Sequence, residues 1–92
     1  MVEFEWDEHN REHIWQRHGV TADEAEEVFE DRHLYRYGSR ASDERRTIYV
    51  GRTFEGRLLA VAVTVRDSSL RVVTARDANT WEVKRYRRTE KR

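Results

Sequence analysis

The stretch RLLAVAVTVR, residues 57–66, contains six consecutive apolar residues and has an arginine at either end. A valine-rich run of this length is typical of a strand buried on both faces at the centre of a sheet. It is far shorter than the roughly 20 apolar residues that a membrane-spanning helix needs. The segment therefore predicts a central strand, and we expect no membrane partner.

Four further strands are predicted around this central one. HLYRYGS, residues 33–39, has the length of a short edge strand, and RTIYVGR, residues 46–52, is β-branched and aromatic. LRVVTAR, residues 70–76, follows the central strand after a turn-like RDSS sequence. Near the N-terminus, VEFEW, residues 2–6, alternates apolar and acidic residues, as a strand with one buried face does.

Three helices are predicted from capping signals. The first helical segment extends to His18 and is followed by Gly19, a residue favoured directly after a helix. The second and third carry a glutamate three residues after their first capping residue, Glu24 and Glu82, which is the spacing of a capping box. The N-terminal capping residues are Asp7, Thr21 and Asn79.

The resulting order of elements is β-α-α-β-β-β-β-α, which indicates an α+β fold with helices packed on a mostly antiparallel sheet. A chain of 92 residues fits a single domain, residues 1–92, that buries roughly two-thirds of its unfolded surface. The sequence has no cysteine, so neither disulfides nor thiolate metal sites are expected. Its N-terminus is acidic where a signal peptide would be basic, and a cytoplasmic location is therefore expected.

The net charge of zero hides a division along the chain. Residues 1–31 carry eleven acids and two arginines, a net charge of −9, whereas residues 32–92 carry sixteen bases and seven acids, a net charge of +9. A basic half of this strength suits a surface that meets phosphates or an acidic partner. Mutual neutralisation of the two halves in the folded protein is the alternative, and both stay open at this point.

The sequence HNREH, residues 9–13, matches the H-x-x-E-H pattern of inverted zinc peptidases. A catalytic zinc ion needs a third protein ligand and a sheltered site. On a helical projection His9 and His13 fall opposite the sector that we expect to be buried, which comprises Arg11, Ile14, Trp15 and His18. We therefore expect no metal or other cofactor, and a zinc hydrolase using His9 and His13 is the last of the alternatives.

Two longer stretches carry a family resemblance. FEWDEHNREHIWQRHGVTADEAEEVF, residues 4–29, resembles the start of the BrnT family of bacterial type II toxins, with its F-x-W-D opening, H-G-V and V-F. VGRTFEGRLLAVAVTVRDSSLRVVTARDANTWEVKRY, residues 50–86, is similar to the second half of that family. The family's closing A-R-x-A-x-x-x-E-x-x-x-Y pattern is matched here by Ala75, Arg76, Ala78, Glu82 and Tyr86.

The resemblance implies a RelE-like fold, a metal-independent ribonuclease activity, an RNA substrate and an antitoxin that silences the toxin. A heterotetramer with an antitoxin dimer is one candidate assembly. The sequence departs from the family pattern at two positions. The family usually has lysine where this chain has Asn10, and often asparagine where it has Ile14.

Metal-free RNA cleavage by the 2′-hydroxyl requires a general base, cations around the phosphorus and a general acid. Arginine suits the phosphate because its planar fork binds two oxygens and stays charged. Histidine titrates in the useful range, and tyrosine can stack on a base or donate a proton. Our candidate catalytic residues are Arg76, Arg52, His18 and Tyr86. Our candidate RNA-binding residues are Arg57, Arg66, Arg71 and Arg85.

A structural role is the competing interpretation for each of these residues. Arg52, Arg66, Arg71 and Arg76 lie in or at the ends of predicted strands, where some could converge on one sheet face or simply pair with the acidic helices. His18 could only cap its helix, and Tyr86 could only pack the last helix on the sheet. The three tryptophans are expected to be core or partner-facing anchors. A non-catalytic module that binds nucleic acid or protein is the second functional hypothesis.

Overall fold

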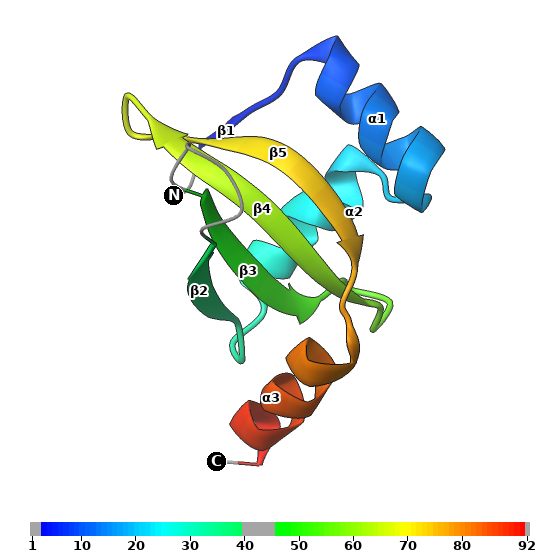
Figure 1. Ribbon diagram of the computed structural model, residues 1–92, viewed down its shortest axis with the longest axis vertical. Coiled ribbons are helices and arrows are strands. Elements are labelled where there is room, and N and C mark those ends of the chain that lie inside the picture. Colours follow the sequence, from blue (N-terminus) through cyan, green and yellow to red (C-terminus); the bar gives the residue numbers. More distant parts are fainter. Residues whose placement is uncertain (1–2, 40–45, 92) are drawn as a thin grey trace.

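The computed structural model describes residues 3–39 and 46–91, so that Val2 of the predicted first strand lies outside the described residues (Figure 1). Its elements follow the predicted order and confirm the α+β fold. In chain order they are β1 (Phe4–Glu5), α1 (Glu8–His18), α2 (Ala22–Glu27), a 3-10 turn (Val28–Glu30), β2 (Tyr35–Ser39), β3 (Arg46–Arg52), β4 (Leu58–Arg66), β5 (Ser69–Asp77) and α3 (Thr80–Glu90).

The sheet has the order β1-β5-β4-β3-β2, with the predicted central strand β4 in the middle. Its pairings are antiparallel except that of β1, which lies parallel to β5 through Phe4 opposite Leu70. An irregularity in the β4–β5 register falls between Ala62 and Val63. The first and the last strands in the described part of the chain are thus neighbours, and β1 forms the edge of the sheet next to β5.

The helix ends follow the predicted capping signals. The Asp7 carboxylate accepts a hydrogen bond from the backbone N–H of Asn10, and Gly19 ends α1 in the left-handed region with φ 62°. Thr21 with Glu24 and Asn79 with Glu82 each form a complete capping box. Local chemistry is therefore sufficient to set where each helix begins.

Helices α1 and α2 cover one face and one edge of the sheet, with α2 behind the strands and α1 beside β5 (Figure 1). The core on this side is aliphatic. From the sheet it takes side chains such as Leu59, Val61 and Val63, which alternate along β4. From the helices it takes Ile14 and Val28, both fully buried. Removal of these side chains from water is the main stabilising contribution on this side.

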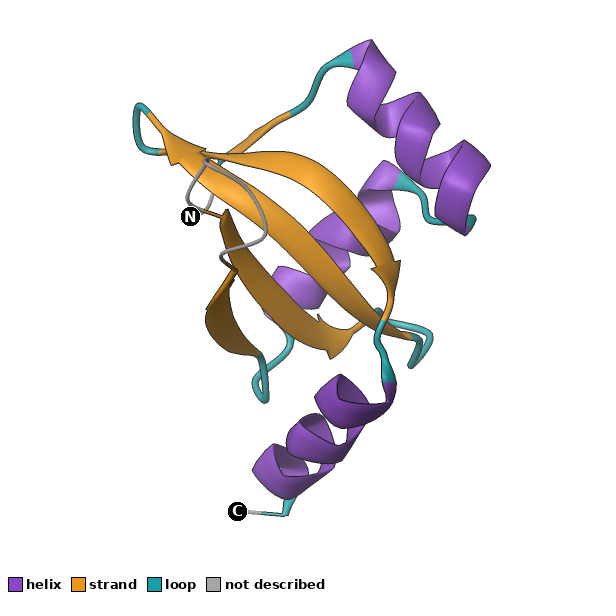
Figure 2. Ribbon diagram, in the orientation of Figure 1, coloured by secondary structure: helices purple, strands orange, loops and turns teal. Residues whose placement is uncertain are grey.

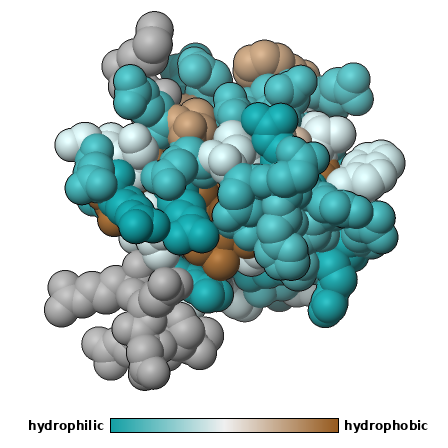
Figure 3. All heavy atoms as spheres, turned by 90° about the horizontal axis from the view of Figure 1, so that it is seen from above, coloured by the Kyte–Doolittle hydropathy of each residue, from teal (hydrophilic) through white to brown (hydrophobic). Residues whose placement is uncertain are grey.

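Helix α3 stands apart from the other two helices, at one end of the sheet (Figure 2). It packs on the opposite sheet face through Tyr86, which joins Val50 and Ala60 in a second buried cluster. Tyr35 and Tyr37 of β2 border this cluster. Seen from above, the molecule shows mostly hydrophilic side chains with a few hydrophobic groups among them (Figure 3). No helix in the described part of the chain is both long and apolar enough for a membrane span.

The orientation of α1 corrects one sequence expectation. Ile14 is buried and His18 half-buried as predicted, but Arg11 is exposed and Trp15 is 58% exposed. The reason is that α1 packs on β5 through the row that contains Asn10 and Ile14, and the Asn10 side-chain amide donates to the Val72 carbonyl at 2.9 Å. A helical projection gives the row spacing, but the docking partner decides which row is buried.

Candidate active site and nucleic-acid interface

The four strand arginines share one sheet face. Residues opposite each other in neighbouring strands point to the same side, and Arg52, Arg71 and Arg76 lie opposite even-numbered residues of β4. Arg66 is itself an even-numbered residue of β4. However, the positions of Arg52 and Arg66 differ by eight residues along β4, or about 26 Å at the rise of a strand. The arginines therefore face the same way without converging on one phosphate.

Arg76 is fixed by a fully buried carboxylate of α3. Its Nη1 donates to Glu82 Oε1 at 2.7 Å and its Nη2 to Glu82 Oε2 at 3.2 Å. The Tyr37 hydroxyl also donates to the Glu82 carboxylate, as does the backbone N–H of Asn79. We call these groups the Arg76–Glu82–Tyr37 network. It ties β2, β5 and α3 together at the end of the sheet.

The electrostatics of this network keep Glu82 ionised. Burial opposes its charge, but the hydrogen bonds from Arg76, Tyr37 and Asn79 outweigh burial and hold the Glu82 pKa below its ordinary value of 4.5. Burial, together with the bond to Glu82, raises the pKa of Tyr37 to about 12. Near neutral pH the network is therefore an ion pair with a neutral phenol.

One edge of the Arg76 guanidinium is not used in these hydrogen bonds. The two Nη atoms engage Glu82, and Nη1 also donates to the Asp77 carbonyl at 3.2 Å. Within residues 3–39 and 46–91, no well-formed hydrogen bond engages the Nε–H or the second hydrogen of Nη2, although the Tyr37 hydroxyl interacts with the guanidinium. The side chain is 32% exposed. Because these two hydrogens form a second fork, Arg76 can still bind two phosphate oxygens.

His18 lies close to this end of the sheet, at the C-terminus of α1. Arg57 holds that terminus, since it donates to the carbonyls of His18 at 3.1 Å and Gly19 at 2.8 Å. The same guanidinium pairs with Asp77 at 2.9 Å and with Glu24 at 3.4 Å. Arg57 therefore caps α1 and joins it to β5, a role that the sequence did not indicate.

The pKa of His18 is lowered from its ordinary value of 6.5. Burial is the largest cause, and the positive charges of His13, Arg17 and Arg76 add to it. His18 is consequently neutral near pH 7 and can accept a proton.

Arg52 and Tyr86 lie toward the other end of α3. The Tyr86 side chain is 1% exposed, and its hydroxyl donates to Asp31. Arg52 lies over the Tyr86 ring at 5.2 Å and pairs with Glu90 at 3.4 Å. Burial and the bond to Asp31 raise the pKa of Tyr86. These contacts are those of side chains that dock α3 on the sheet.

The remaining predicted RNA-binding arginines do not form a cluster. Arg66 is exposed, and its side chain makes no hydrogen bond or ion pair with the described residues. Arg71 pairs with Asp7 at 3.4 Å, beside the start of α1. Arg85 lies on the outer surface of α3, with its guanidinium 4.5 Å from the centre of the Tyr35 ring. The structure thus brings Arg57 to the end of α1 that carries His18, holds Arg76 on the α3 side of the sheet, and separates the others.

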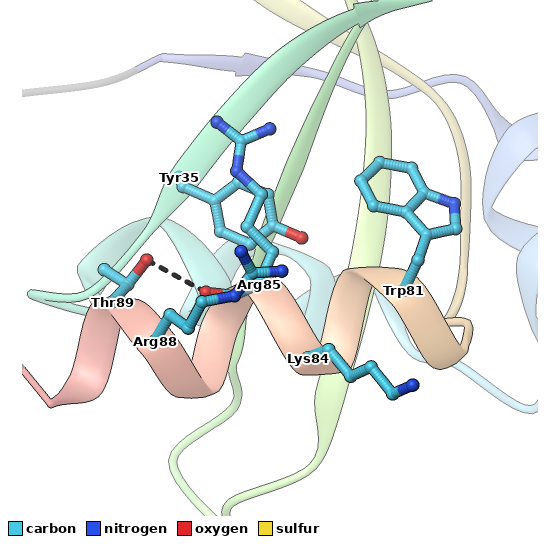
Figure 4. A pocket seen from close by; sticks show the side chains of 6 residues that line it. All are labelled: Tyr35, Trp81, Lys84, Arg85, Arg88 and Thr89. Atoms are coloured by element: carbon cyan, nitrogen blue, oxygen red, sulfur yellow. Dashed lines mark hydrogen bonds between the residues drawn. The ribbon is translucent and has the colours of Figure 1, made fainter.

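The outer surface of α3 holds residues that the sequence interpretation missed. Together with Tyr35, it forms a groove of about 620 Å³, lined by Tyr35, Trp81, Lys84, Arg85, Arg88 and Thr89 (Figure 4). We call it the α3 groove. A signal was present in the sequence, because positions 81, 84, 85 and 88 have the spacing of one helix face.

Ion pairs neutralise the charge division only in part. Among the described residues, Arg57–Glu24 and Arg71–Asp7 join the basic half of the chain to the acidic half. The other pairs, including Arg76–Glu82, lie within the basic half. Much of the positive charge of α3 is therefore available to an anionic partner.

The histidine motif does not gain further ligands. His9 is exposed, and its ring lies 6.4 Å from that of the half-buried His13. In the described part of the chain, no group of three or more histidine, cysteine, aspartate or glutamate side chains is arranged to hold a metal ion.

Comparison with known proteins gives a family and a fold. Residues 6–82 match the family of ribonuclease toxins, BrnT, of type II toxin–antitoxin systems. The structure is similar to the crystal structure of the Brucella abortus ribonuclease toxin BrnT, with a TM-score of 0.68 and 24% identity over 87% of this chain and 100% of that one. At this identity the structural likeness shows the fold alone. No curated protein matches the sequence.

Proposed function

The chain belongs to the BrnT family of ribonuclease toxins, and on that premise we propose that it cleaves RNA without a metal ion. In this reaction the RNA's own 2′-hydroxyl attacks the adjacent phosphorus, and the bond to the 5′-oxygen of the next nucleotide breaks. The products are a cyclic 2′,3′-phosphate and a free 5′-hydroxyl. The protein has to take the proton from the 2′-hydroxyl and hold the negative charge that builds at phosphorus, and the departing 5′-oxygen takes up a proton in turn, from a general acid or from water.

Arg76 is the residue that we assign to the phosphate. The observation that carries this assignment is the pair with Glu82, which fixes the guanidinium and leaves its Nε–Nη2 edge without a well-formed hydrogen bond among the described residues. A fixed donor needs no reorganisation as charge develops, which is the condition for transition-state stabilisation. Glu82 and Tyr37 are positioning residues in this proposal.

His18 is the general base that we assign to the 2′-hydroxyl. Its lowered pKa keeps the imidazole neutral near pH 7, and the charge of Arg76 is one of the causes of that lowering. Arg57 positions it by binding the His18 carbonyl. Arg52 and Tyr86 are left out of the reacting groups, because their contacts with Glu90 and Asp31 favour a packing role.

The test is the variant Arg76→Lys. Lysine keeps a positive charge next to Glu82 but has no second fork for a phosphate. We expect cleavage of a defined single-stranded RNA to fall roughly 100-fold, the usual loss for one fixed donor to a transition state. Circular dichroism and urea unfolding would show that the variant is folded. Alanine is unsuitable here, because it would leave the buried Glu82 carboxylate without its cation.

Two outcomes would change the proposal. Equal cleavage by wild type and Arg76→Lys would remove Arg76 from the reaction. No cleavage by a folded wild-type protein that still binds RNA would favour the second candidate, a non-catalytic binding module. The observation that favours this second candidate is Asn10, which stands where the family usually has lysine and is occupied with the Val72 carbonyl.

Membership of a toxin–antitoxin family implies an antitoxin partner. We propose a cytoplasmic complex in which an antitoxin dimer holds two copies of this chain. Light scattering on the co-purified complex would give its mass and so separate this heterotetramer from a simple heterodimer.

A further inference from the structure

The α3 groove presents one face of a helix to solvent. Trp81, Lys84, Arg85 and Arg88 recur at intervals of three and four residues, so their side chains project from the same side of α3. Figure 4 shows Trp81 at one end of this row and Arg85 and Arg88 near Tyr35 at the other. From residue 81 to residue 88 the helix rises about 10 Å. The groove can therefore follow a short extended segment of a ligand.

The charge of this groove is positive because the acids of α3 point elsewhere. Glu82 is buried against Arg76, and Glu90 pairs with Arg52, so both acids of α3 are taken by arginines of the sheet. The cations of the groove make no ion pair with the described residues; they are Lys84, Arg85 and Arg88. An unpaired row of cations is the electrostatic footprint of an anion-binding surface.

Aromatic rings stand among these cations. Trp81 is 48% exposed, and its ring centre lies 4.8 Å from that of Tyr37. Tyr35 carries the Arg85 guanidinium on its ring. An exposed indole flanked by cations suits a ligand that has both flat rings and negative charges. Single-stranded nucleic acid has this combination, whereas in a duplex the base faces are already stacked.

The groove also adjoins the Arg76–Glu82–Tyr37 network. Trp81 touches Tyr37, Tyr37 donates to Glu82, and Glu82 holds Arg76. A strand whose phosphate lies at the free edge of Arg76 would reach Trp81 next. We propose that the α3 groove binds single-stranded RNA beside the cleaved phosphate, with Trp81 stacking on an unpaired base and Lys84, Arg85 and Arg88 holding backbone phosphates.

This inference rests on the proposed function for its substrate, and its test does not depend on cleavage. The probe is a short fluorescent 2′-O-methyl RNA, which lacks the attacking hydroxyl, used as a single strand and annealed to its complement. Fluorescence anisotropy gives the affinity at several salt concentrations. The variants are Trp81→Ala, Trp81→Phe and the double variant Lys84→Ala with Arg88→Ala. The matched control is Arg87→Ala, an exposed cation of α3 that does not line the groove.

We expect Trp81→Ala to weaken single-strand binding about tenfold and Trp81→Phe, which keeps a flat ring, to restore most of it. The double variant should reduce the slope of log affinity against log salt by about 1.4, because each lost phosphate contact removes about 0.7. Arg87→Ala should leave both quantities near those of the wild type. Circular dichroism would show that each variant is folded.

Several results would overturn the assignment. Unchanged affinity in Trp81→Ala and in the double variant would do so, as would an equal loss in Arg87→Ala, which would show attraction by overall charge alone. Equal binding of the duplex probe would reject the single-strand specificity. If these variants bind RNA normally but no longer bind the antitoxin, the groove is a protein-binding site. If the wild type binds through Trp81 but does not cleave, the inference stands and the proposed function fails.

Discussion

The two faces of the sheet differ in what they bury. On the side of α1 and α2 the buried cluster consists of aliphatic side chains such as Leu59 and Val61. On the side of α3 a tyrosine ring shares the buried space with the Glu82 carboxylate. Aliphatic burial stabilises whatever its neighbours do, whereas a buried charge is tolerated only while its partners stay in place. The face covered by α1 and α2 thus supplies most of the stability, and the face covered by α3 carries the polar groups that could take part in a reaction.

The largest expected effect is a loss of stability, and two adjacent residues allow the two faces to be compared directly. Leu59 is fully buried on the aliphatic side, and Leu58 is partly buried on the α3 side. Leu59→Ala should lower the free energy of unfolding by about 2–5 kcal/mol, and Leu58→Ala by about half of that or less. Urea denaturation would measure both. Equal losses would mean that the two faces contribute alike to stability.

A smaller effect is expected from Glu82→Gln, which keeps the shape of the side chain and removes its charge. We expect a loss of about 1–3 kcal/mol at neutral pH, since hydrogen bonds to a charged group are broken or weakened. Glu90→Gln is the matched control on the same helix. Its surface pair with Arg52 should contribute only about 0–1 kcal/mol.

The pH dependence of the Glu82 contribution has a definite sign. The folded-state pKa of Glu82 lies below its ordinary value of 4.5, so its contribution is complete above that value and is lost as the pH falls through the folded-state pKa. Unfolding curves of wild type and Glu82→Gln should therefore approach each other in acid. Parallel pH profiles would show that the ionised carboxylate does not stabilise the α3 side.

The smallest expected effect concerns the pH dependence of cleavage, which tests the role proposed for His18. If His18 is the general base, cleavage slows as the imidazole becomes protonated. Because its pKa is lowered from 6.5, less than half of the full rate should be lost at pH 6.5. Single-turnover cleavage at a series of pH values would measure this. A midpoint at or above 6.5, or an unchanged profile in His18→Gln, would remove His18 from the reaction.

The helices and strands were predictable from the sequence because their signals are local. Asp7 and Gly19 bound α1 through contacts within a few residues, and the apolar run at the centre of the chain became β4. The exposure of Trp15 was not predictable in the same way. It depends on how α1 meets β5, and that contact joins segments far apart in the chain.

The candidate site was predictable only in part for a similar reason. The sequence points to Arg76 through its place at the end of a strand and its match to the family pattern, whereas for Glu82 it shows a capping spacing and a family match but no partner. In the structure the Glu82 carboxylate accepts from the Asn79 amide and pairs with Arg76 at the same time. A capping pattern predicts the hydrogen bond of a side chain within its own helix, but it does not predict a partner in a neighbouring strand.

The pairing of β1 with β5 determines how this protein can be made. During synthesis β2, β3 and β4 can pair with one another as they emerge, since they are neighbours in the chain and in the sheet. Phe4 and the helix that follows it have to wait for Leu70 and the rest of β5, their docking strand. Arg76 and Glu82 are translated later still. A translation product that stops before β5 therefore has no docked α1 and no Arg76–Glu82 pair, and both arrangements can form only after residues 69–82 have been made.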